Sequence, residues 1–137
     1  MSQSTDAILA YGYDLNAIAG DFDEIDFTDL IPQAIQDEIA QVDGYYDLFE
    51  SIPDYLRMHD CDGVDIVSHC SCEYAMYILG FQMARAWRGD VRRLDLNTLL
   101  HDAVAQDCEA KVIRAAKVLG IDVKGQTPGW LLVSMWC

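Results

Sequence analysis

Positive charge is scarce in this sequence. The 137 residues hold nine lysines and arginines against 23 aspartates and glutamates, and the net charge is −14. The shortage is sharpest in residues 1–65, where Arg57 is the only lysine or arginine beside sixteen acidic residues. A field of this sign repels nucleic acids and anionic membranes and attracts basic surfaces. We therefore expect a basic protein as the partner, and no direct binding to nucleic acid or to a membrane.

Long apolar runs and catalytic motifs are also missing. No window approaches the roughly 18 apolar residues of a membrane-spanning helix. Residues 1–14 have neither the basic segment nor the apolar core of a secretory signal, so we expect the five cysteines to be reduced thiols inside a cell. There is no phosphate-binding glycine loop, nucleophile elbow or zinc-protease helix. These absences predict a protein that is not an enzyme and holds no cofactor.

Apolar residues, in contrast, are plentiful. They make up 52% of the chain, which is enough for one packed core, and 137 residues fit a single domain over residues 1–137. Alternating or β-forming apolar residues predict four strands, although the third segment is also compatible with a helix. The four segments are residues 6–15, 64–70, 74–87 and 129–136.

Helical spacing of apolar residues predicts a long helix over residues 97–119, which Gly120 follows as a C-terminal glycine. Two short acidic helices are expected earlier. The first runs from Thr28 or Asp29 to Gly44, and the second covers residues 45–51, where Pro53 stops or kinks it. The expected fold class is α+β: a small, mostly antiparallel sheet that includes both terminal strands and is packed by the long helix, with the two acidic helices packed elsewhere.

The acidic residues concentrate before and within these short helices. Four of them recur at positions i, i+4, i+7 and i+11, so they share one side of a helix if the helix continues past Pro53. These four are Asp43, Asp47, Glu50 and Asp54. They would span roughly 16 Å, where a nucleic-acid strand places about five phosphates. Interleaved tyrosines are typical of interface anchors. The predicted partner-binding residues are Asp21, Asp23, Glu24, Asp26, Asp29, Asp43, Tyr45, Tyr46, Asp47, Glu50 and Asp54. The alternative is a solvated surface that serves solubility.

A cluster of cysteines and histidines occupies residues 59–72 and supplies enough side chains for a zinc ion. Its spacing argues against zinc, because Cys70 and Cys72 on a strand share one face while His69 takes the other, and no Cys-x-x-Cys pair is present. We expect buried structural cysteines and no metal. The alternative is a zinc-binding module or a metal-dependent enzyme that uses Cys61, His69, Cys70 and Cys72.

Two further groups stand out in the second half of the chain. Arg85, Arg88, Arg92 and Arg93 form the only basic cluster, and we expect them to pair with carboxylates of the acidic half. Trp130 and Trp136 are six residues apart, which puts them on the same face of the last strand, and we expect both in the core.

Four segments carry a resemblance to known sequences: TDAILAYGYDL, VSHCSCEYAMYIL, WRGDVRRLD and PGWLLVSMW. With them the chain resembles a group of uncharacterised small acidic proteins of actinobacteriophages and actinobacterial genomes, of the type AYGYDL…GWLLxSxW. The resemblance covers about half the chain and leaves out residues 16–63; relatives often have glycines after the first strand, where this chain has NAIAG. It implies a phage origin and action in the cytoplasm of a bacterial host, and it supplies no catalytic residues.

Size, charge and implied origin together predict a non-enzymatic, phage-derived interaction protein. We expect an acidic inhibitor that occupies a basic, nucleic-acid-binding site of a host protein, as counter-defence decoys such as anti-CRISPR proteins do. A structural or assembly protein of the phage is a further alternative.

Overall fold

Four strands form a mostly antiparallel sheet in the computed structural model, which describes residues 5–20, 26–43 and 48–136. β1 pairs with both β3 and β4, and β2 forms an antiparallel hairpin with β3. Two short parallel pairings between β2 and β4 close the sheet into a barrel with the order β1-β3-β2-β4. The predicted α+β fold, with both terminal strands in the sheet, is confirmed. The strands are β1 (Thr5–Asp14), β2 (Asp65–Ser71), β3 (Ala75–Ala86) and β4 (Gly129–Trp136).

The pairing of β1 with β3 depends on two glycines that face each other. A Cβ atom on Gly12 would lie 2.1 Å from the carbonyl oxygen of Leu79, and one on Gly80 would lie 2.1 Å from the carbonyl oxygen of Tyr11. The two backbones approach so closely that no side chain fits between them. This close approach fixes the register in which β1 and β3 pair.

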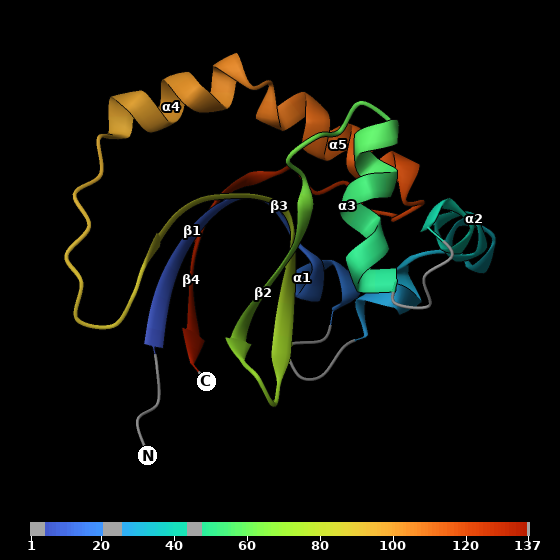
Figure 1. Cartoon of the computed structure of the whole chain (residues 1–137), viewed down its shortest axis with the longest axis horizontal. Helices are drawn as coiled ribbons and strands as arrows, with labels where there is room; N and C mark the ends of the chain where they lie inside the picture. Colours follow the sequence, from blue (N-terminus) through green and yellow to red (C-terminus); the bar gives the residue numbers. More distant parts are fainter. Residues whose placement is uncertain (1–4, 21–25, 44–47, 137) are drawn as a thin grey trace.

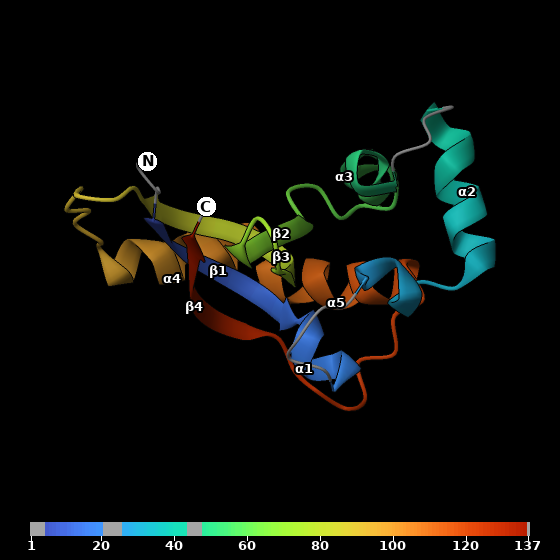
Figure 2. The ribbon, with the colours of Figure 1, turned by 90° about the horizontal axis from the view of Figure 1, so that it is seen from below.

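Five helices and a short 3₁₀ helix surround the sheet within the described residues (Figures 1 and 2). A larger core packs α1, α3 and α5 against the sheet, and a smaller one fills the barrel. None of the described helices has the length and apolar content that a bilayer crossing needs. The elements are α1 (Leu15–Ala19), η1 (Phe27–Leu30), α2 (Gln33–Asp43), α3 (Leu48–Met58), α4 (Leu96–Ala105) and α5 (Cys108–Val118).

The long helix predicted over residues 97–119 is in fact two helices. α4 ends at Ala105, and Asp107 adopts a left-handed conformation with φ of 56° before α5 begins. Only α5 packs closely on the sheet: it buries Cys108, Val112, Ala115 and Ala116, whereas α4 buries no residue. The prediction was wrong because apolar residues keep helical spacing across the break, so periodicity alone does not reveal it.

The short helices also differ from prediction. Residues 27–30 form the 3₁₀ helix η1, and α2 begins only at Gln33. α3 continues through Pro53 to Met58, so the predicted stop is wrong. Proline removes one backbone hydrogen bond, but burial of Ile52, Tyr55 and Leu56 stabilises the helix on both sides of it. Residues 44–47, where the second short helix was expected to begin, lie outside the described residues.

Candidate interaction surfaces

Helices α2 and α3, together with η1, form one end of the molecule, opposite α4 (Figures 1 and 2). We call residues 26–43 and 48–58 the acidic end. The two helices are joined by a hydrogen bond in which the Tyr55 hydroxyl donates to Glu38 Oε2 at 2.9 Å. Seven acidic residues and one base, Arg57, belong to this end. The acidic residues are Asp26, Asp29, Asp37, Glu38, Asp43, Glu50 and Asp54.

Most carboxylates of the acidic end are exposed and keep their charge uncompensated. Within the described residues its single ion pair joins Asp54 Oδ1 to Arg57 Nη2 at 2.9 Å. Asp26 caps η1 by accepting hydrogen bonds from the Thr28 backbone N–H at 3.0 Å and from its hydroxyl at 2.6 Å. Such hydrogen bonds orient a carboxylate without neutralising it. Seven acids against one base therefore leave this end with a net charge of −6.

The predicted row of four acids along one helix does not form. Asp43 is the last residue of α2, whereas Glu50 and Asp54 belong to α3, and Figure 2 shows these two helices inclined to each other. Asp26 and Asp29 lie at η1, on the same end of the molecule. The predicted residues Asp21, Asp23, Glu24, Tyr45, Tyr46 and Asp47 lie outside the described residues.

The basic cluster pairs with the acidic half through Arg85. Arg85 Nε donates to Asp6 Oδ2 at 3.0 Å, and Arg85 Nη2 makes an ion pair with the same oxygen. The guanidinium of Arg85 also lies 4.5 Å from the centre of the Trp87 ring, within cation–π range. Arg92 Nη1 donates to the Arg85 carbonyl oxygen at 3.5 Å. The predicted pairing is therefore present for Arg85, and it neutralises the buried Asp6 rather than the acidic end.

The cysteines and histidines of residues 59–72 are dispersed. Cys61 is buried in the larger core, and burial raises the pKa of its thiol. His69 is buried, which lowers the pKa of its imidazole, and its Nε2 has no hydrogen-bond partner among the described residues. Cys70 is exposed, and Cys72 takes part in a disulfide, so the prediction of reduced thiols is wrong for Cys72. In the described part of the chain, no three potential ligands gather into a metal site.

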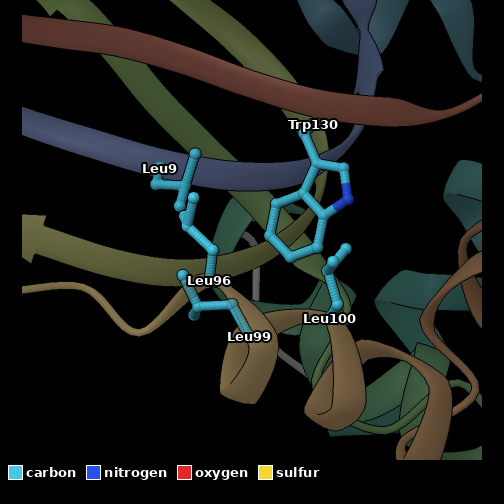
Figure 3. A pocket seen from close by; sticks show the side chains of 5 residues that line it. All are labelled: Leu9, Leu96, Leu99, Leu100 and Trp130. Carbon is cyan, nitrogen blue, oxygen red and sulfur yellow. The ribbon is translucent and has the colours of Figure 1, made fainter.

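A second surface, which the sequence analysis missed, lies between α4 and the sheet. It is a hollow of about 240 Å³ whose walls are entirely apolar. Figure 3 shows side chains from α4 facing side chains from the sheet across it. The lining residues are Leu9 of β1, Leu96, Leu99 and Leu100 of α4, and Trp130 of β4.

The two tryptophans are exposed rather than part of the core, and Trp130 lines this hollow. They share one face of β4 as predicted, but it is the outward face: Trp130 is 36% exposed and Trp136 51%. Leu132 between them is 77% exposed, whereas Leu131 and Val133 on the other face pack inside the barrel. An alternating strand with one solvated face carries polar residues there. The apolar residues on both faces of residues 130–136 are the signal that would have revealed this surface.

Comparisons with protein-family models, curated proteins and solved structures found no match for this chain. The resemblance to actinobacteriophage proteins therefore stays a prediction. Fold and surfaces together define a small α+β protein with a charged end and an apolar hollow between α4 and the sheet.

Proposed function

We propose that this protein is a non-enzymatic inhibitor whose acidic end binds a basic, nucleic-acid-binding site of a host protein. The observation that supports the proposal is the uncompensated charge of that end, where seven acids accompany one arginine. Carboxylates distributed over these two helices carry the same sign of charge as a phosphate backbone, so they can take its place in a basic groove of the partner protein. Binding there excludes the nucleic acid by direct competition.

The buried apolar residues that hold α2 and α3 in place also support this role. Ile39 of α2 and Ile52 and Leu56 of α3 are fully buried beneath the exposed carboxylates. A preorganised surface loses little conformational entropy on binding, so more of the electrostatic attraction appears as affinity. The hydrogen bond between Tyr55 and Glu38 ties the two helices to each other and adds to this rigidity.

The proposal includes the setting that the resemblance implies. A phage-encoded protein acting in the cytoplasm of a bacterial host meets nucleic-acid-binding defence proteins, which carry basic clefts for DNA or RNA. An anti-CRISPR-like or other counter-defence decoy fits a small acidic chain of this kind. Long-range attraction between opposite charges would speed the encounter with such a target.

The test is capture of the partner and loss of that capture when the charges are removed. Immobilised protein is exposed to lysate of an actinobacterial host, bound proteins are identified by mass spectrometry, and the partner is purified for competition against labelled DNA or RNA. The variant carries Asp26→Asn, Asp29→Asn, Glu50→Gln and Asp54→Asn together. We expect its affinity to fall at least about tenfold, since each exposed charge contributes a few tenths of a kcal/mol or more to a charged interface.

A matched control removes the same number of charges elsewhere. Glu73→Gln, Asp90→Asn, Asp102→Asn and Glu109→Gln change four carboxylates outside the acidic end. This control should bind the partner as the unaltered protein does. Equal losses in both variants would show that net charge alone matters, and a captured partner without a basic nucleic-acid site would contradict the proposal.

A further inference from the structure

Exposed apolar side chains are concentrated in two segments of the chain, residues 87–104 and β4. Of the eleven large apolar residues that are exposed in the described parts of the chain, nine lie in residues 87–104 or in β4. On α4, Leu96, Leu100 and Val104 are 66%, 54% and 81% exposed, one helical turn apart. Scattered exposed leucines are normal on a protein surface, but a continuous group of this size marks an interaction site.

Three adjoining hollows form a continuous groove. The hollow described above shares Leu9 with a second, of about 110 Å³, which adds Leu94 and Leu132. It shares Leu100 and Trp130 with a third, of about 330 Å³, which adds Val104. We call these three hollows together the apolar groove. In the first hollow one wall is α4 and the other is the outward face of β1 and β4 (Figure 3). The second hollow is also lined by β3 and by Arg85 and Arg92, and the third by Asp107 and by Glu109 of α5.

The distribution of charge indicates which kind of molecule binds in the apolar groove. Residues 87–105 contain three arginines and three aspartates, and β4 contains no charged residue, so the segments around the apolar groove carry no net charge. The whole net charge of −14 comes from the rest of the chain. Two molecules of this protein repel each other at most approaches, and this face is the one where they meet with least repulsion.

The exposed area is also sufficient. Large aromatic side chains present about 150–250 Å² each, and the nine exposed apolar residues together present on the order of 1,000 Å² at their observed exposures. A stable protein–protein interface buries about 800 Å² on each partner. These nine residues together therefore offer enough apolar area for a stable dimer, and six of them line the apolar groove.

We propose that a second copy of this chain occupies the apolar groove and that the protein is a two-fold symmetric dimer. In such an interface the same patch serves both copies, so a helical wall on one molecule can pack on the sheet wall of the other and the reverse. α4 is placed for this because it buries no residue in its own molecule. Residues 87–95, which connect it to β3, contain no helix or strand and are exposed throughout.

The test is the molar mass in solution, measured by size-exclusion chromatography with light scattering at protein concentrations of up to about 100 μM. The unaltered protein should have twice the 15.4 kDa of one chain. Leu100→Asp in the helical wall and Leu132→Asp in the sheet wall should each halve that mass. Both side chains are more than half exposed, so each variant should keep the circular dichroism spectrum of the folded protein.

Met58→Asp is the matched control, because Met58 is 66% exposed but lies on α3, away from the apolar groove. This variant should stay dimeric, as should the variant in which four carboxylates of the acidic end are neutralised. That outcome separates the dimer from the proposed function. A mass of 15.4 kDa for the unaltered protein at every concentration would overturn the inference, whether α4 closes on its own sheet or a different protein fills the groove. A dimer that persists in both aspartate variants would overturn it as well.

Discussion

The acidic end and the apolar groove lie at opposite ends of one small fold and differ in almost every property. The acidic end carries a net charge of −6 on helices that bury Ile39, Ile52 and Leu56. The apolar groove is bounded by uncharged β4 and by α4, which buries no residue. The difference shows that charge and most of the exposed apolar area are segregated, which is the arrangement expected if the two proposed surfaces bind different molecules.

The largest expected contrast is in stability. Ile52→Ala in α3 removes a fully buried side chain from the larger core and should lower the free energy of unfolding by about 2–5 kcal/mol. Leu100→Ala in α4 removes a side chain that is 54% exposed and should change it by less than about 0.5 kcal/mol. Chemical denaturation of dilute protein measures both values. Similar losses in the two variants would mean that α4 packs as closely as α3.

Salt should act on the two surfaces in opposite directions. Binding of a basic partner by the acidic end should weaken about tenfold or more between 50 and 300 mM salt, because ions screen attraction between exposed charges. Self-association through the apolar groove, whose lining contains two arginines and two acidic residues, should stay constant or strengthen, because salt also screens the repulsion between two chains of charge −14. Titration calorimetry measures the binding of the partner, and light scattering measures self-association, over the same series of salt concentrations. Parallel responses would contradict the assignment of different forces to the two surfaces.

The barrel between the two ends should make the fold sensitive to acid. Burial lowers the pKa of His69 below its ordinary value of 6.5, so the unfolded chain takes up a proton more readily than the folded one. Stability is therefore full above about pH 6.5 and decreases as the pH falls below it. His69→Gln should flatten this dependence in thermal denaturation curves. A pH dependence that is the same in His69→Gln as in the unaltered protein would contradict this prediction.

A smaller effect is expected within the acidic end itself. Tyr55→Phe removes the hydrogen bond to Glu38 between α3 and α2 and should lower the free energy of unfolding by about 0.5–1.5 kcal/mol. Tyr74→Phe, at a residue that is 58% exposed, should leave it unchanged. Thermal denaturation measures both. An unaltered melting temperature for Tyr55→Phe would mean that this hydrogen bond does not stabilise the pair of helices.

Local patterns were most informative where neighbours along the chain are enough to define an element. The predicted strand over residues 129–136 coincides with β4, because its composition favours β-structure whatever packs on it. The break at Asp107 was not predictable, because one left-handed residue interrupts a helix without disturbing its apolar spacing. The passage of α3 through Pro53 was also missed, since the burial that offsets the lost hydrogen bond involves distant residues.

The candidate surfaces, like the fold, could be predicted from the sequence only in part. Counting acids and bases was enough to predict that the excess of acidic residues lies in residues 1–65, and the predicted residues Asp26, Asp29, Glu50 and Asp54 lie at the acidic end. Their arrangement as one helical row was wrong, because Asp43 and Glu50 belong to different helices. Trp130 and Trp136 were expected in the core because tryptophan is usually buried, and only the pairing of β4 shows which of its faces points outward.

Composition and periodicity alone determined the fold class, the strand at each end and the sign of the charge near the N-terminus, because these depend on residue types and their spacing. The tertiary structure decided which apolar faces are buried, since burial depends on segments far apart in the chain. α5 packs on the sheet and α4 buries no residue, although the helical spacing of apolar residues continues unchanged from α4 into α5. The apolar groove exists because Leu9, Leu100 and Trp130, from three separate elements, face a common space.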